Sequence, residues 1–277
     1  MTHIKNIFLV LLMTITSQSC LFGKILELDT LATFEHVVGP IDEHTFILFD
    51  VDETLITPKD AVLGPKGQLF VEQLIGELLE KGGAQKYDTL LGRVLATAAF
   101  DVVEKRTSVL IQELQAQDIV VFAFTAAESG QIGEISSFSD FRVKQLQDMG
   151  YDFTSAFPQL DVLKLNKNDP KKGEPLFKSG ILFSSDHPKG EILKQFLTTL
   201  KLKPSKIIFV DDRIDFLASV EDAMKDMQIE FLGLHYLALE KFSKEVDEKL
   251  ASFQFKHLIE QGEWLNDEKA RKQLDSF

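Results

Sequence analysis

Two acidic clusters follow hydrophobic stretches of this sequence, each at the point where a buried strand should end. The first contains Asp50 and Asp52, and the second contains Asp211 and Asp212. Continuous apolar runs like those before them are typical of strands buried on both faces of a parallel sheet. Such strands deliver side chains at their carboxyl ends, where open α/β sheets bind ligands. Because gathered carboxylates repel one another unless a cation or protons compensate them, we predict a site for a hard metal ion such as Mg²⁺.

The overall composition limits what such a site could act on. The chain has 277 residues, of which 44% are hydrophobic and 26% charged, as expected for a globular protein of one domain plus an insertion, or two small domains. The net charge of −13 argues against general binding of nucleic acids and against docking on anionic membranes. A small phosphate ester remains a compatible partner, because a metal ion and one or two basic residues can reverse the field inside a cleft.

The amino terminus is predicted to be an export signal. Lys5 precedes the apolar stretch 7–13, and small polar residues follow it, which is the order of a secretory signal peptide. The apolar stretch is too short to span a bilayer. We expect a signal peptide over residues 1–23, cleaved between Ser19 and Lys24, and a mature protein that is periplasmic or secreted.

The single cysteine, Cys20, lies at this cleavage boundary, so the mature body has no pair of cysteines for an intramolecular disulfide. Lipidation of Cys20 is an open alternative. The residues before it make a poor lipoprotein signal, because Ser17 stands where an aliphatic residue is usual. No other stretch of the chain is predicted to span a membrane, and the sequence does not predict the oligomeric state.

Beyond this segment the sequence alternates between strand and helix patterns. Strands are expected at about 45–49, 119–124, 180–184, 207–211 and 229–236. Helical patterns occur at about 58–107, interrupted by a glycine turn at 81–84, and before 117, after 139, after 188 and from about 250 to the end. This alternation predicts an α/β fold with a Rossmann-like, doubly wound and mainly parallel sheet.

Four separated motifs in this frame resemble those of one enzyme superfamily. They are Asp50-x-Asp52-x-Thr54, Thr125 at a strand end, Lys189-Gly190 at a helix start, and Asp211-Asp212 at a later strand end. Their order is that of the haloacid dehalogenase superfamily, and the chain resembles its phosphatases over about residues 45–236. It also resembles, more loosely, uncharacterised exported bacterial members. The first motif is the most specific, because an Asp-x-Asp-x-Thr sequence behind a hydrophobic strand rarely arises by chance.

The resemblance implies a role for each matched residue. Asp50 would be the nucleophile that forms an aspartyl-phosphate, and Asp52 would be the general acid and base. Thr125 would hydrogen-bond the transferring phosphoryl group, while Lys189 would pair with Asp50 and with the phosphoryl oxygens. An Asp at position 52, rather than Thr or Ser, favours a phosphatase over a slow phosphotransferase or an ATPase.

The resemblance also implies the ligands of a Mg²⁺ ion. Asp50, the backbone carbonyl of Asp52 and the carboxylate of Asp211 would bind the metal, and Asp212 would bind it directly or through water. Asp215 would support these ligands from a second layer.

The helical insertion at about 58–107 is what the resemblance would make a small cap, within a hydrolase domain spanning 24–277. A cap would exclude water during transfer and select the substrate. Arg93, Lys105 and Arg106 are its candidates for substrate contacts, and a solvated helix face is their alternative reading.

The residues alone leave simpler readings open. An Asp or Thr at a strand end is commonly a turn or capping residue, which applies to Thr125 and Asp215 above all. The histidine spacings predict no zinc site, and the sequence contains no nucleophile motif of serine hydrolases.

We predict an exported, Mg²⁺-dependent phosphomonoesterase that hydrolyses a small organic phosphate through Asp50. The alternative is an exported metal-binding or interaction protein of the same fold with little or no catalytic turnover. A phosphomutase is a third hypothesis.

Overall fold

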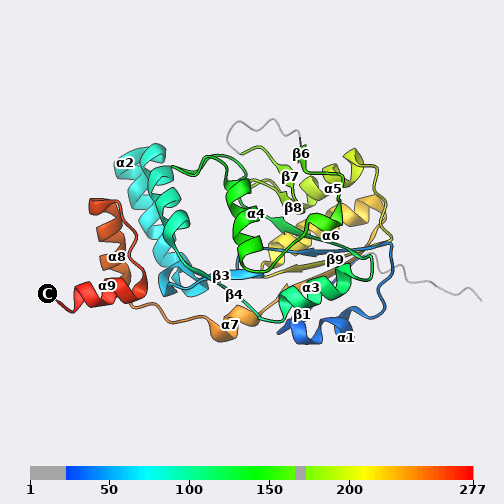
Figure 1. Ribbon diagram of the computed structural model, residues 1–277, viewed down its shortest axis with the longest axis horizontal. Helices are drawn as coiled ribbons and strands as arrows, with labels where there is room; N and C mark the ends of the chain where they lie inside the picture. Colours follow the sequence, from blue (N-terminus) through cyan, green and yellow to red (C-terminus); the bar gives the residue numbers. More distant parts are fainter. Residues whose placement is uncertain (1–22, 166–172, 277) are drawn as a thin grey trace, which may run out of the picture.

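The computed structural model describes residues 23–165 and 173–276 (Figure 1). The predicted signal peptide up to residue 22, with Cys20, lies outside the described residues, as do Lys167, Lys171 and Lys172 of a lysine-rich loop.

In the described part of the chain, an eight-stranded sheet has the order β1-β10-β9-β2-β5-β8-β7-β6. Its strands are β1 (Gly23–Leu28), β2 (Thr45–Phe49), β5 (Val120–Thr125), β6 (Val162–Lys164), β7 (Leu176–Lys178), β8 (Ile181–Phe183), β9 (Lys206–Asp211) and β10 (Glu230–Tyr236). The first six strands in this order, β1-β10-β9-β2-β5-β8, pair in parallel with their neighbours. The last two, β7 and β6, are added antiparallel at one edge. The predicted mainly parallel α/β sheet is therefore confirmed.

Helices cover both faces of this sheet (Figure 1). The α-helices of the described residues, on the sheet and beside it, are α1 (Phe34–Val38), α2 (Gln68–Thr97), α3 (Thr107–Gln115), α4 (Phe138–Asp148), α5 (Lys189–Thr199), α6 (Ile214–Met227), α7 (Ala238–Phe242), α8 (Glu248–Gln261) and α9 (Asp267–Leu274). Ile47 and Phe49 of β2 share a core with α1, α3 and α4, whereas Phe46 and Leu48 share one with α5 and α6. Because successive strand residues point to opposite faces, the four-residue apolar run 46–49 supplies both cores.

Strand β1 was not predicted from the sequence. It pairs with β10 along its whole length, so the strand expected first, at 45–49, is the second along the chain. β1 is an edge strand in which only Leu28 is fully buried, and a short, half-exposed strand carries little apolar signal.

The insertion after β2 begins and ends in a short antiparallel pair, β3 (Ile56–Pro58) and β4 (Phe100–Val102). Between them lie 3₁₀ turns at Ala61–Leu63 and Pro65–Gly67 and the long helix α2. The backbone of α2 leaves helical geometry at Gly83, where φ is 72°, inside the predicted turn at 81–84.

The C-terminal helices pack on this insertion rather than on the sheet (Figure 1). Ala251, Phe255 and Leu258 of α8 share a buried cluster with Leu90 and Val94 of α2. We call α2, α8 and α9 the helical layer. The sequence predicted the insertion and the terminal helices separately, and their common core was not predicted.

Asp60 fixes the C-terminal helices to the start of the insertion. Its buried carboxylate accepts hydrogen bonds from Trp264 Nε1 at 2.8 Å and from the backbone N of Asp267 at 2.9 Å. Arg93 makes a second link, because its Nη1 donates to the carbonyl of Gly262 at 3.0 Å. Arg93 therefore contacts the end of α8, whereas it was a candidate for substrate contact.

No helix in the described residues has the length and apolarity needed to cross a membrane.

Candidate active site

Three neighbouring strands of the sheet end at the predicted site. Thr125 ends β5 and Asp211 ends β9, while Asp50 follows β2, which lies between them. The backbone N of Asp50 donates to the carbonyl of Val210 at 2.8 Å, which sets the two acidic strand ends side by side. The common strand direction thus brings together residues that are far apart in the sequence.

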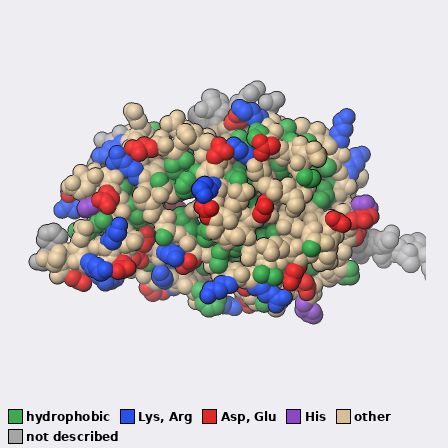
Figure 2. Space-filling model, viewed as in Figure 1, with side chains coloured by type: hydrophobic (Ala, Val, Ile, Leu, Met, Phe, Trp, Pro, Cys, Tyr) green, Lys and Arg blue, Asp and Glu red, His purple; other side chains and the backbone are tan. Residues whose placement is uncertain are grey.

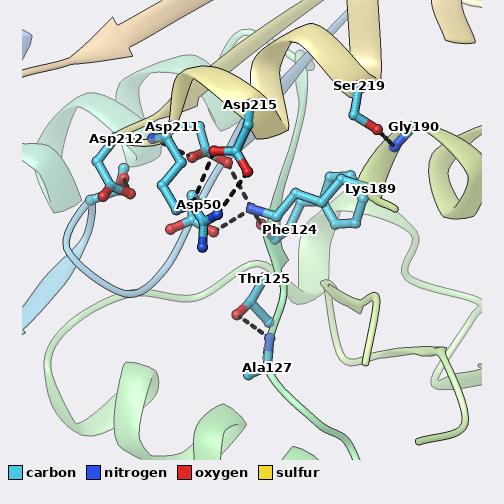
Figure 3. A network of polar contacts seen from close by, with 12 residues as sticks. Asp50, Phe124, Thr125, Ala127, Lys189, Gly190, Asp211, Asp212, Asp215 and Ser219 are labelled. Carbon is cyan, nitrogen blue, oxygen red and sulfur yellow. Dashed lines mark hydrogen bonds and ion pairs between the residues drawn. The ribbon is translucent and has the colours of Figure 1, made fainter. Parts of the chain in front are cut away.

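The carboxylates of Asp50, Asp211 and Asp212 form one group. One oxygen from each lies within 4.8 Å of the others (Figure 3). Burial, together with repulsion among these neighbouring carboxylates, raises the pKa of Asp50 to about 8, that of Asp211 to about 6 and that of Asp212 to about 8. Three gathered carboxylate oxygens fit a hard divalent cation such as Mg²⁺.

Lys189 places an ammonium group among these carboxylates, and no other ammonium is in contact with them among the described residues. Its side chain is 0% exposed, and Nζ donates to Asp50 Oδ1 at 2.5 Å and to Asp211 Oδ2 at 2.7 Å (Figure 3). A third bond, of 3.0 Å, goes to the carbonyl of Phe124. Burial alone would lower the pKa of Lys189, but Asp211 and Asp50 outweigh it and raise the pKa above its ordinary value.

Gly190 allows α5 to bring Lys189 to this position. A Cβ at residue 190 would lie 1.9 Å from the carbonyl oxygen of Ser219 in α6. Instead the two helices touch, and the backbone N of Gly190 donates to Ser219 Oγ at 3.1 Å (Figure 3). The Lys-Gly pair therefore has a packing reason as well as a chemical one.

Thr125 is buried at the end of β5. Its Oγ1 accepts a hydrogen bond from the backbone N of Ala127 at 3.0 Å (Figure 3). This is the capping contact of the simpler reading, and it leaves the hydroxyl hydrogen available for another acceptor. Both readings of Thr125 are compatible with this geometry.

The side chain of Asp52 lies apart from the three-carboxylate group. It is 45% exposed, and its Oδ1 is 2.8 Å from Nη2 of Arg142. The next residue, Glu53, has a positive φ of 66°, and its backbone N donates to the carbonyl of Ile56. This tight turn carries the chain from the site into β3. Burial and the charge of Asp52 raise the pKa of Glu53 to about 7.

Asp215 makes no direct contact with the aspartate group among the described residues. Arg213 donates to it from Nε at 3.1 Å and from Nη2 at 2.7 Å. The backbone N of Arg213 in turn donates to Asp211 Oδ1 at 2.8 Å. Any support from Asp215 would therefore pass through Arg213. Asp212 has its own neighbours, with Thr54 Oγ1 3.5 Å from its Oδ1 and His235 Nε2 3.0 Å from its carbonyl.

Arg142 of α4 was missed by the sequence analysis. An arginine in a helix carries no distinctive signal when it is considered alone. The position of Arg142 relative to its neighbours was informative, because Phe138 and Leu146 lie four residues before and after it on the buried face of α4. An arginine in the middle of an apolar stripe indicates a buried charge that needs a partner.

A groove of about 720 Å³ lies between α4 and the end of the insertion, and Gln145, the hydrogen-bond partner of Arg142, is one of its lining residues. The surface is hollowed between α2 and α4 (Figure 2). Its apolar lining comes from Ala98, Phe100, Phe141 and Met149. Its charged lining residues are Lys144 and three acidic residues, Glu134, Asp140 and Asp148. The other cap candidates, Lys105 and Arg106, are exposed at the start of α3.

A family model described as "Protein of unknown function (DUF2608)" matches residues 28–271. The chain belongs to this family. The span matched by DUF2608 includes every strand end of the site, and also α8 of the helical layer. The part of the chain that carries the helical layer is thus as much a part of DUF2608 as the sheet.

Relatives extend over most of the DUF2608 chain. An uncharacterised protein of Rickettsia prowazekii is 21% identical over 88% of each chain. A Chlamydia pneumoniae protein, named as a candidate outer membrane protein, is 22% identical over 81% of this chain and 82% of its own. A Chlamydia trachomatis protein named in the same way is 24% identical over 76% of each.

Solved structures similar to this DUF2608 protein include two hydrolases of the haloacid dehalogenase type. The Streptococcus pneumoniae protein is 14% identical, covers 69% of this chain and 94% of its own, and has a TM-score of 0.32. The Geobacter sulfurreducens protein is 9% identical, covers 71% and 94%, and has a TM-score of 0.35. Scores below 0.5 do not establish a common fold, so the fold class rests on the strand order and directions of the sheet.

Proposed function

We propose that this protein is a Mg²⁺-dependent phosphomonoesterase that hydrolyses a small organic phosphate through an aspartyl-phosphate on Asp50. The observation that carries the proposal is Lys189, fully buried and bonded to both Asp50 and Asp211. An anionic nucleophile can attack a phosphate ester only where cationic groups neutralise the oxygens, and a buried ammonium beside two aspartates meets that need.

In the first step, an oxygen of Asp50 attacks phosphorus and forms an O–P bond. The bond from phosphorus to the ester oxygen breaks, and its electron pair stays on the leaving oxygen. Asp52 gives its proton to that oxygen, so an alcohol departs. Lys189 and the hydroxyl of Thr125 bind the transferring phosphoryl oxygens.

In the second step, a water molecule attacks phosphorus and passes a proton to Asp52. The O–P bond to Asp50 breaks, with its electron pair returning to the carboxylate, and inorganic phosphate leaves. Each group is then in its starting state, so the cycle balances.

Asp50, Asp211 and Asp212, with the backbone carbonyl of Asp52, would hold the Mg²⁺ ion. When bound, the ion supplies positive charge that neutralises the phosphoryl oxygens and the carboxylates. Two features support this assignment: the three carboxylates are buried together, and repulsion among them adds to the effect of burial in raising their pKa values.

We also propose that the helical layer acts as the cap, and that the organic part of the substrate lies in the groove beside α4. Gly92 of α2 supports a closed cap, since a Cβ there would lie 2.6 Å from the carbonyl of Ile132, in the loop after β5. The groove is lined by apolar side chains and by three carboxylates against one ammonium, which favours an organic group over a second phosphate.

Export to the periplasm or beyond is part of the proposal. It rests on the predicted signal peptide, and the names of the two chlamydial relatives agree with it.

The test is an assay of phosphate release from a panel of phosphomonoesters, with Mg²⁺ or with a chelator. We expect Mg²⁺-dependent release that falls at least about 10³-fold in Asp50→Asn. Asp226→Asn is the matched control, because Asp226 is exposed on α6 and pairs with Lys194. Equal and chelator-insensitive release by Asp50→Asn contradicts the proposal, and no release from any ester favours the binding-protein alternative.

A further inference from the structure

Arg142 is a buried cation held in one orientation. Its side chain is 3% exposed, and its Nη1 donates to Gln145 Oε1 at 2.8 Å. The guanidinium carbon lies 5.0 Å from the ring centre of Phe138. Nη2 lies 2.8 Å from Asp52 Oδ1. Among the described residues, Asp52 is the one carboxylate that forms an ion pair with Arg142.

Stability alone is a weak reason for this pair. Burying a guanidinium costs free energy, and because Asp52 is 45% exposed, solvent weakens the attraction that would offset this cost. The Nε of Arg142 is buried without a hydrogen-bond partner among the described residues, which adds to that cost. What the pair does provide is a fixed position for the carboxylate of Asp52.

The two oxygens of Asp52 differ in a way that suits proton transfer. Oδ1 forms the ion pair with Arg142, whereas no contact to a described residue is found for Oδ2, and the side chain is 45% exposed. A group that passes a proton to a substrate needs one oxygen anchored and the other free to face the reacting atom.

Helix α4 also links Arg142 to the phosphoryl end of the site. The backbone N of Phe138 donates to the carbonyl of Gly130 at 2.7 Å, and that of Ser139 to the carbonyl of Ser129 at 3.0 Å. These carbonyls belong to the loop that follows Thr125. The same loop therefore fixes both Thr125 and the helix that carries Arg142.

We propose that Arg142 is the positioning residue for Asp52, and that it aligns Oδ2 of Asp52 with the leaving-group oxygen. This inference rests on the proposed function, in which Asp52 protonates that oxygen. Arg142 acts through Asp52 and does not touch the phosphoryl group.

The test compares two kinds of ester in the full chain. Alkyl phosphates need a proton on the leaving oxygen, whereas p-nitrophenyl phosphate has a leaving group that departs without one. The ratio kcat/KM includes only the steps up to the first product, so it reports on this proton transfer. For Arg142→Gln we expect a loss of about 10²-fold with the alkyl ester and of less than about 5-fold with the aryl ester. Asp52→Asn should show the same pattern.

Two further variants separate positioning from folding. Arg142→Lys should restore part of the alkyl-ester activity, and the double variant with Asp52→Asn should be no slower than Asp52→Asn alone. Arg271→Gln is the matched control, because Arg271 pairs with Asp247 far from the site in α9. The unfolding temperature of each variant shows whether it is folded. If Arg142→Gln does not fold, the two esters are compared in Arg142→Lys instead.

Each other result overturns the inference. Equal losses with both esters and a raised KM would mean that Arg142 binds the phosphoryl group directly. Unchanged kinetics in a folded Arg142→Gln would mean that Asp52 needs no positioning. A wild-type protein that releases phosphate from no ester removes the proposed function itself, which is a separate result from an active wild type with an unaffected variant.

Discussion

Gly190 and Ser219 are in direct contact, and a Cβ on residue 190 would fall 1.9 Å from the Ser219 carbonyl oxygen. This contact sets the distance between α5 and α6. It therefore also sets the position of the Lys189 ammonium relative to Asp50 and Asp211. We predict that Gly190→Ala lowers stability by about 1–3 kcal/mol, the usual cost of overpacking, and reduces phosphatase activity more than tenfold. Thermal unfolding and phosphate release would measure the two effects.

The control for this variant is Gly76→Ala. Gly76 lies within α2, and a Cβ there would meet no atom within 4 Å. The substitution should leave activity unchanged and stabilise the helix slightly. An unaffected Gly190→Ala would contradict the close packing of α5 on α6.

Lys189→Met removes the ammonium that bridges Asp50 and Asp211. Breaking a buried ion pair from one side typically costs about 3–5 kcal/mol, because it leaves a charge without compensation. We expect the free energy of unfolding, measured with urea at pH 8 in chelator, to fall by about this amount. Phosphatase activity should be lost as well. Lys194→Met on the same helix is the control, since Lys194 is half-exposed and pairs with Asp226. Equal effects of the two substitutions would argue against a special role for Lys189.

The metal-free protein should become less stable as the pH rises. The folded pKa values of Asp50 and Asp212 are about 8, above the ordinary value of 3.8, so the folded state holds protons that the unfolded state has lost. Their stabilisation is fully present below about pH 4 and is lost as the pH rises toward 8, by up to about 1.4 kcal/mol per pH unit and proton. Unfolding temperatures in chelator should therefore fall between pH 5 and pH 8.

Added Mg²⁺ should reverse this trend. A bound cation stabilises the ionised carboxylates of the folded state, so the gain in unfolding temperature should be larger at pH 8 than at pH 5. Asp212→Asn should raise the unfolding temperature in chelator at pH 8 and weaken the response to Mg²⁺. A response that is the same at both pH values, or intact in Asp212→Asn, would place the ion elsewhere.

Asp60→Ala removes the acceptor shared by Trp264 and the backbone of Asp267. Leaving these donors unpaired should cost about 1–3 kcal/mol and loosen α8 and α9 from α2. Trp264 is the single tryptophan of the chain, so a red shift of its fluorescence would report the loosening. Asp101→Asn is the control, because Asp101 is exposed and pairs with Lys59. An unchanged emission spectrum in Asp60→Ala would contradict this role.

The local signals in the sequence were sufficient for the central strands of the sheet and for much of the site, but not for the outer strands β1, β6 and β7. The apolar runs before Asp50 and Asp211 predict buried strands, and parallel strands deliver their ends to one edge. Lys189 could be predicted because a helix start places it there. The roles in catalysis and metal binding stay predictions, but the geometry does bring Asp50, Lys189 and Asp211 together.

The parts that escaped prediction depend on contacts between distant segments. Arg142 meets Asp52 only because the loop after β5 turns α4 toward the start of the insertion. In the same way, nothing in the apolar faces of α2 and α8 tells which surface each will cover. Both helices could have packed on the sheet, and the hydrogen bonds of Asp60 show why the second one does not.

Three segments of the chain connect the helical layer to the sheet: the ones before and after α2, and the one between α7 and α8. An insertion alone would have two. The third segment, at 243–247, contacts the first, because Lys244 Nζ donates to the carbonyl of Lys59 at 2.8 Å. Bending the joint has to disturb this contact as well as the β3–β4 pair, so the joint is stiffer than a two-stranded one. The C-terminal tail and the insertion are thus held to the sheet as one mechanical unit.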